Sequence, residues 1–285
     1  MPSKPSKNTD LLKAGGSPSS GLRAAIRGAA TGTTPFPDFL QILLFSQLAM
    51  SNSYILQIET ATQVCSVALS ANGETCAFRD VNEPNIHASQ LTLLIADVLQ
   101  EAGLVVGDLA AVAVSKGPGS YTGLRIGVST AKGLCYAADL PLIGMDTLAG
   151  MAAGFKDVHP DVAKQYDRLC PMIDARRMEV YLAIYDREMQ LRQPTSAVVV
   201  DDRTFHTQQA DGRMALFGSG ADKLATLFAD DDRVDVIPGF LNAARYLSGT
   251  AYQAFLAGEF VDVAYFEPYY LKDFVATKAK ASPFA

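Results

Sequence analysis

The residues best suited to bind an anion lie in one glycine-rich run, residues 115–127 (SKGPGSYTGLRIG). The run follows an apolar strand and precedes a helix, so free backbone N–H groups and the positive end of the helix dipole could hold a phosphate. Glycine permits positive φ and a close approach of ligand to backbone. The candidate phosphate contacts in this run are Gly117, Gly119, Ser120, Thr122 and Arg125.

The run does not match the common phosphate or nucleophile motifs. A P-loop needs Lys and then Ser or Thr after its last glycine, whereas Leu124 and Arg125 follow Gly123. The dinucleotide pattern G-x-G-x-x-G fails by one residue, and the nucleophile elbow G-x-S-x-G is absent. Two interpretations therefore stay open, contact with a phosphate or nucleotide and a tight structural turn.

Small residues mark one face of the helix that follows the run. Gly123, Gly127 and Ala131 are spaced by four residues, which places them on the same side of a helix. Small side chains there would let another backbone approach closely. That backbone could belong to this chain's own sheet or to a partner's helix.

Other reactive residue types are dispersed. The four cysteines contain no C-x-x-C pair and the three histidines no H-E-x-x-H motif, so we expect neither a structural zinc site nor a common type of metalloprotease. Dispersed thiols are typical of a reducing cytoplasm. The net charge of −6 lacks the basic surplus of a protein that holds nucleic acid by itself. No apolar run is long enough to predict a membrane-spanning helix.

The elements expected around the glycine-rich run form an α/β pattern. Leu91, Leu94, Ile95 and Val98 follow the spacing of a helical face, which predicts a helix over residues 87–101. A second helix is expected over 123–137, and Asp146 is placed to cap a third. Strands are expected at residues 54–59, 64–70, 74–79, 110–115 and 141–144. An antiparallel meander followed by βα units predicts a mixed sheet with helices on its faces.

A second half is expected to begin near residue 156. Residues 155–168 are interpreted as a polar linker. Strands are expected at 169–174, 179–185, 197–200 and 216–218, and helices at 221–228 and 240–257. Asp174, Arg176 and Arg177 follow the first of these strands, where they could face a cleft between the halves or form a solvated turn.

Residues 1–49 differ from the rest of the chain. They carry five basic and two acidic residues, and residues 1–37 are rich in Ser, Gly, Thr, Pro and Ala without any period, which predicts disorder. The apolar stretch at 39–50 begins too late for a secretory signal, while an organellar transit peptide is compositionally possible. We favour Met50 as the native start and residues 1–52 as an extension outside the folded protein.

Five segments, in order along the chain, resemble one family. They are Ile55–Thr60 (ILQIET), Gly117–Gly127 (GPGSYTGLRIG), Pro171–Tyr181 (PMIDARRMEVY), Phe217–Gly220 (FGSG) and Pro268–Lys272 (PYYLK). With these motifs the chain resembles the bacterial TsaB (YeaZ-type) family over about residues 53–275. The long G-P-G-S-Y-T-G-L-R-I-G run is the most specific of them.

The resemblance implies an actin/Hsp70-like (ASKHA) fold of two RNase H-like domains, expected at 53–155 and 156–275 with a flexible tail at 276–285. It also implies a role in making threonylcarbamoyladenosine at position 37 of tRNA. Members of this family pair with the catalytic paralogue TsaD, while TsaE supplies an ATPase, and they form homodimers when alone. The chain would reach tRNA only through the complex, in the cytoplasm and without a membrane.

Two departures from the catalytic relatives predict a degenerate site. The catalytic paralogue binds its metal partly through H-x-x-x-H, whereas His87 is followed by Leu91 at the second position. The wider superfamily ends its first strand in an Asp that organises metal and phosphate, and Glu59 stands there in this chain. We therefore expect no catalytic residue, no metal and no tightly bound cofactor. ATP or ADP with Mg could still bind at the partner interface.

The resemblance adds nucleotide-contact candidates at Glu59, Thr60, Gly218 and Gly220. Each candidate has a simpler structural alternative. Glu59 could merely bind neighbouring backbone, the two glycines could end a strand, and Arg125 could pair with a carboxylate of a partner.

The function that we expect is a non-catalytic scaffold subunit whose helices at 87–101 and 123–137 bundle with the equivalent helices of TsaD. The expected contact residues are His87, Leu91, Leu94, Ile95, Val98, Gly123, Gly127 and Ala131. The alternative is a weak stand-alone nucleotide-binding protein or ATPase.

Overall fold

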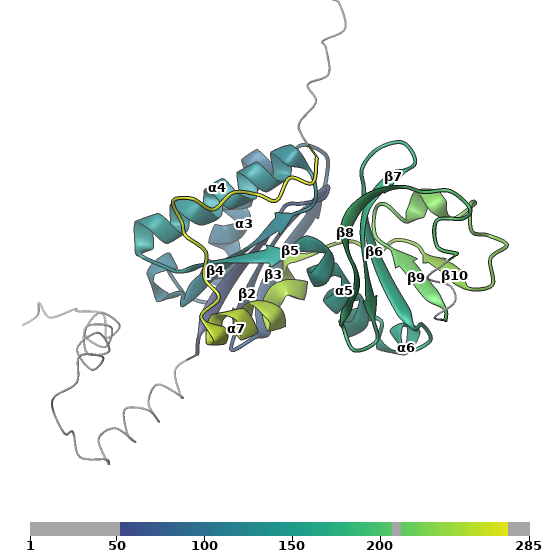
Figure 1. Cartoon of the computed structure of the whole chain (residues 1–285). Coiled ribbons are helices and arrows are strands. Elements are labelled where there is room, and N and C mark those ends of the chain that lie inside the picture. Colours follow the sequence, from purple (N-terminus) through teal and green to yellow (C-terminus); the bar gives the residue numbers. More distant parts are fainter. Residues whose placement is uncertain (1–51, 207–211, 273–285) are drawn as a thin grey trace, which may run out of the picture. The chain divides into compact units, whose positions relative to one another are not determined.

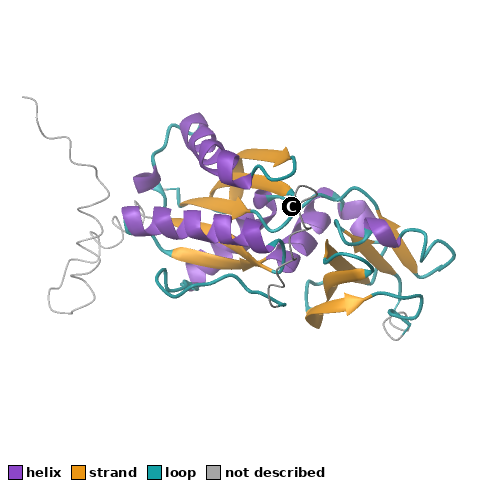
Figure 2. Cartoon of the chain, turned by 90° about the horizontal axis from the view of Figure 1, so that it is seen from above, coloured by secondary structure: helices purple, strands orange, loops and turns teal. Residues whose placement is uncertain are grey.

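The structure is a computed structural model that describes residues 52–206 and 212–272 (Figure 1). The expectations for residues 1–51 and for the tail at 276–285 lie outside these ranges. From Asn52 onward the described residues belong to one compact unit. The strands fall into two sheets, which Figure 2 shows as two groups of arrows.

The first sheet has the strand order β3-β2-β1-β4-β5. Its strands are β1 (Tyr54–Glu59), β2 (Val64–Ala71), β3 (Glu74–Asn82), β4 (Ala111–Gly117) and β5 (Leu142–Asp146). The first three form an antiparallel meander, whereas β1, β4 and β5 run parallel. The Asn72-Gly73 turn between β2 and β3 has positive φ at both residues, as a tight hairpin requires. This is the mixed sheet that the sequence predicts.

Two long helices, α3 (His87–Glu101) and α4 (Tyr121–Ala138), cover one face of this sheet (Figure 1). The predicted spacing explains α3, because its apolar side chains at three- and four-residue intervals pack onto strand residues such as Leu56 and Ile58. Ser120 caps α4 by accepting a hydrogen bond from the Gly123 N–H at 3.2 Å. The opposite face packs against α7 (Ser248–Ala257).

The second sheet has the strand order β10-β9-β6-β7-β8. Its strands are β6 (Arg168–Asp174), β7 (Glu179–Asp186), β8 (Leu191–Val199), β9 (Met214–Phe217) and β10 (Val234–Ile237). Helix α5 (Thr147–Val158) packs on it, with the Phe155 ring stacked on Phe217 at 4.1 Å between centroids. As predicted, Asp146 caps α5, because its carboxylate accepts a hydrogen bond from the Ala149 N–H at 3.0 Å.

Several expectations for the second half are wrong. Most of the supposed linker at 155–168 is helical, comprising the end of α5 and the short α6 (Pro160–Ala163). The helix expected at 221–228 is reduced to a 3-10 turn, η3 (Asp222–Leu224). The helix expected at 240–257 begins only with the 3-10 turn η4 (Ala244–Leu247) that precedes α7. From the sequence, no strand is expected at the position of β10, residues 234–237.

The closing segment, residues 259–272, returns to the first sheet and runs along α4 (Figure 1). Val261 bridges to Leu142 at the edge of β5. The Lys132 ammonium of α4 donates to the backbone carbonyls of Ala264 and Phe266 at 3.1 and 2.9 Å. Because α7 and this segment both contact the first sheet, the predicted second domain, 156–275, contributes its last part to the first half of the fold.

Candidate functional site

The predicted site lies at the carboxyl end of β1, where Glu59 is fully buried between β2 and β4. The Ala61 N–H donates to Glu59 Oε1 at 2.6 Å. The hydroxyl of Ser115 on β4 and the amide of Asn242 lie close enough to favour the ionised carboxylate. Glu59 thus accepts a hydrogen bond from neighbouring backbone, which is what the simpler of its two predicted roles requires.

Burial dominates the electrostatics of Glu59. It raises the pKa of the carboxyl from the usual 4.5 to about 7, because the Ala61 N–H and the Ser115 and Asn242 side chains offset only part of the desolvation. Glu59 Oε2, Ser115 Oγ and Asn242 Nδ2 are buried without a hydrogen-bond partner among the described residues. The site therefore keeps hydrogen-bonding capacity that ordered water could use.

The glycines of the run are packed against this chain's own backbone. A Cβ added at Gly123 would lie 2.1 Å from the Thr60 carbonyl oxygen, and one at Gly127 would lie 2.2 Å from Thr60 Oγ1. A Cβ at Gly119 would lie 2.4 Å from the Ala61 carbonyl oxygen, which also accepts a hydrogen bond from the Ser120 N–H at 2.7 Å. The chain itself fills the space beside these glycines, which favours the structural-turn interpretation.

The other predicted nucleotide contacts follow the same pattern. Gly117 has a φ of 119°, and a Cβ there would lie 2.7 Å from the Tyr269 carbonyl oxygen. Gly218 and Gly220 follow β9 and lie beside β6. A Cβ at Gly218 would lie 2.5 Å from the Met172 carbonyl oxygen, and one at Gly220 would lie 2.8 Å from the Ile173 carbonyl carbon. Close packing on β6 is thus sufficient to explain glycine at both positions, which is the structural alternative to a contact with adenine.

Ser120, Thr122 and Arg125 are the exposed members of the predicted set. The Arg125 guanidinium donates to the Tyr121 hydroxyl at 2.7 Å, and the Tyr121 ring packs on Tyr270 of the closing segment at 4.9 Å between centroids. These residues line a groove between α4 and the closing segment. Glu59 and Thr60 are buried, so the structure does not bring Arg125 together with them into one open phosphate site.

The predicted partner-contact residues on α3 and α4 are also buried within the chain. His87 is 8% exposed, and the other seven residues are buried as well. They are Leu91, Leu94, Ile95, Val98, Gly123, Gly127 and Ala131. This prediction is corrected as to residues, because the apolar stripe of each helix packs onto its own sheet.

The turn between β6 and β7 places Arg176 and Arg177 in solvent, as one of the two predicted arrangements has it. Both residues have positive φ, 72° and 49°. That conformation costs about 1–2 kcal/mol per non-glycine residue. The Asp174 carboxylate accepts a hydrogen bond from the Arg176 N–H at 3.0 Å, which helps to hold the turn.

Comparison with known proteins identifies the family. The family model for tRNA N6-adenosine threonylcarbamoyltransferase (TsaD) matches residues 84–280. The tRNA threonylcarbamoyladenosine biosynthesis protein TsaB of Escherichia coli (strain K12) is 35% identical over 237 residues, which cover 79% of this chain and 96% of that protein. The chain belongs to the TsaB family. By contrast, the tRNA N6-adenosine threonylcarbamoyltransferase of Halalkalibacterium halodurans matches at 38% identity over only 34% of this chain and 33% of that protein.

Solved structures of the TsaB (YeaZ-type) family agree with this assignment. YeaZ from Pseudomonas aeruginosa superposes with a TM-score of 0.65 at 28% identity, covering 77% of this chain and all of that one. The fold is the actin/Hsp70-like (ASKHA) type that the sequence predicts. Within residues 52–206 and 212–272, no group of three or more His, Cys, Asp or Glu side chains could hold a metal ion. No helix in those ranges is long and apolar enough to cross a membrane.

Two residues next to Glu59 are not among those that the sequence predicts for the site. Ser115 lies on β4 next to Glu59, so its place at the end of a buried strand was a usable signal. Asn242 carries no local signal, because it comes from the loop before η4, far along the chain. That loop is held by the Ala244 N–H, which donates to the Ser66 hydroxyl of β2 at 2.7 Å.

Proposed function

We propose that the chain is a non-catalytic scaffold subunit of the machinery that makes threonylcarbamoyladenosine at position 37 of bacterial tRNA, and that it pairs with a TsaD-like catalytic subunit. The observation that carries this proposal is the match to TsaB along 96% of that protein, against one third of the length of a transferase. Further proposed associations are a TsaE-like ATPase, a homodimer when the chain is alone, and tRNA reached through the complex in the cytoplasm.

The outer faces of α3 and α4 support a helical interface. Leu93 on α3 is 56% exposed and Tyr136 on α4 is 87% exposed, although both are large apolar or aromatic side chains. The two helices pack on the same face of the first sheet, so a partner's helices could cover both outer faces at once. Large exposed side chains on neighbouring helices are typical of association surfaces.

A scaffold without chemistry of its own can act by selecting a conformation of its partner. A subunit that binds only the competent state raises the population of that state by its differential affinity, with couplings of ~1–3 kcal/mol being typical. The chain's own atoms fill the space beside the glycine-rich run. ATP or ADP with Mg, where the complex uses it, would therefore bind at the partner interface and not to this chain alone.

The proposal is tested by size-exclusion chromatography with light scattering on the full chain, alone and mixed with the TsaD-like protein of the same organism. We expect a homodimer that is replaced by a 1:1 complex, and modification of tRNA that requires both subunits. A well-folded chain that forms no complex and hydrolyses ATP by itself would overturn the proposal in favour of a stand-alone ATPase.

Replacing Leu93 with Glu should weaken pairing at least tenfold, because a carboxylate would be desolvated in the helical interface. The fold should be unaffected, since Leu93 is exposed. The matched control is Leu191→Glu on β8, where the leucine is 54% exposed and lies away from both helices. The affinity for the TsaD-like protein, measured by calorimetry, should fall for Leu93→Glu and stay unchanged for Leu191→Glu. Equal affinities for the two variants would exclude this face.

A further inference from the structure

The β6–β7 turn carries two arginines in a conformation that arginine does not favour. Arg176 and Arg177 have φ of 72° and 49°. Tight hairpin turns with positive φ at successive residues normally use Asn-Gly, Asp-Gly or Gly-Gly, which adopt that conformation with less strain. Two exposed guanidinium groups at this point are therefore not explained by the stability of the turn. Strain of this kind is concentrated at functional sites.

The carboxylates nearest this turn are already paired with lysines. Asp174 forms an ion pair with Lys223, and Glu179 forms one with Lys272 of the closing segment. Lys223 also donates to the Glu179 carbonyl at 2.7 Å. Within the described ranges, the side chains of Arg176 and Arg177 have neither an ion pair nor a hydrogen bond. The positive charge of the turn thus remains available to an outside anion, although the whole chain has a net charge of −6.

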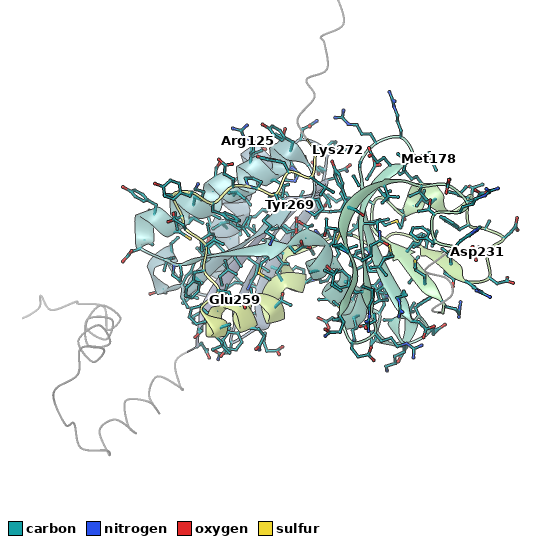
Figure 3. The ribbon with its side chains drawn as sticks, in the orientation of Figure 1. Arg125, Met178, Asp231, Glu259, Tyr269 and Lys272 are labelled. Carbon is teal, nitrogen blue, oxygen red and sulfur yellow. The ribbon has the colours of Figure 1, made fainter. Side chains whose placement is uncertain are left out.

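The surroundings of the turn suit a nucleic acid better than a small anion. Met178 is 40% exposed and Val199 is 69% exposed, and the two adjoin through the Val200 N–H, which donates to the Met178 carbonyl at 2.8 Å. Figure 3 shows Met178, Lys272 and Arg125 along the same edge in that view. Guanidinium groups next to exposed apolar surface can contact phosphate and the faces of sugars or bases together.

We infer that the Arg176–Arg177 turn binds the phosphate backbone of RNA. This inference rests on the proposed function, in which the complex acts on tRNA. Each planar guanidinium can donate two parallel hydrogen bonds to a phosphate, and the lysine-paired carboxylates hold the turn in place beneath it. Because the chain as a whole is acidic, the turn supplies a local contact within the complex and does not hold the RNA alone.

The test replaces Arg176 with Asn and Arg177 with Gly in one chain. Asn and Gly adopt positive φ readily, so this variant should fold and show an unchanged or higher Tm. Filter binding would measure tRNA affinity against salt concentration, both for the full chain alone at low salt and for its complex with the catalytic subunit. We expect the affinity for tRNA to fall roughly tenfold. The slope of log K against log salt is negative, and its magnitude should become smaller by about 1–2.

Two further variants complete the design. Arg176→Lys with Arg177→Lys keeps both charges and should retain most of the salt slope, whereas Arg203→Gln removes an exposed arginine elsewhere and should change neither quantity. Wild-type RNA affinity and slope in the Asn-Gly variant would overturn the inference. A loss of ATP affinity with unchanged RNA affinity would overturn it too, because it would assign the turn to a nucleotide phosphate. A complex that forms but modifies no tRNA would count against the proposed function, and the binding comparison would still decide the role of the turn.

Discussion

Replacing Gly123 with Ala should lower the free energy of unfolding by about 2 kcal/mol or more. The added Cβ would lie 2.1 Å from the Thr60 carbonyl oxygen, which is backbone and cannot rotate away. Forcing extra atoms into a packed interior costs about 1–3 kcal/mol and occasionally more, which outweighs the gain of up to ~1 kcal/mol from placing Ala in a helix. Urea denaturation of the full chain, followed by circular dichroism, would measure the change.

The same helix offers a matched control. Gly133 is exposed, and a Cβ there would meet no atom within 4 Å. Gly133→Ala should therefore stabilise the protein by up to ~1 kcal/mol through helix propensity alone. Shifts in the same direction for the two variants would contradict the packing explanation for Gly123.

The packing of Gly123 also decides which substitutions can test a partner interface on α4. Gly127→Leu would be an unsuitable test of a helical partner surface, although Gly127 belongs to the small-residue face. In the structure that face packs on Thr60, so a leucine there would damage the fold and remove pairing for an indirect reason. Substitutions on the outer faces, such as Leu93→Glu, separate binding from folding.

Local pattern predicted the first half of the fold well because its elements are strongly periodic. The bounds of α3 agree with the prediction, and the Asn72-Gly73 turn fixes the meander of β2 and β3. The second half was predicted less well. Residues 155–168 are polar overall, which predicts a linker, but Leu148, Met151 and Phe155 repeat at helical spacing and carry α5 into that stretch.

The predicted site shows what a pattern cannot decide. A helical stripe such as Leu91, Leu94 and Ile95 shows which face is apolar, yet it does not show whether the chain's own sheet or a partner covers it. Likewise, spacing places Gly123 and Gly127 on one face, but their neighbour Thr60 directly follows β1, about sixty residues earlier in the chain, and only the fold brings it there. The spacing therefore indicates which residues share a face, while the neighbours of that face are known only from the fold.

Glu59 should make the protein less stable as the pH rises from about 4.5 to 7. Below pH 4.5 the carboxyl is protonated in both the folded and the unfolded chain, so it has no effect. Between the two values the unfolded chain ionises first, whereas the folded chain retains the proton because burial raises the pKa of Glu59 to about 7. The loss levels off above pH 7 at about 3 kcal/mol, since each pKa unit corresponds to about 1.4 kcal/mol.

Glu59→Gln isolates this contribution from every other titrating group. The amide oxygen can still accept from the Ala61 N–H, and its NH₂ group can donate where Glu59 Oε2 has no partner among the described residues. The variant should therefore match the wild type near pH 4 and exceed its unfolding free energy by up to about 3 kcal/mol at pH 8. Urea titrations of both proteins across this range would measure the difference. A constant difference at all pH values would mean that the Glu59 carboxyl does not change its proton occupancy on folding, and that the polar groups around it are better solvated than their burial indicates.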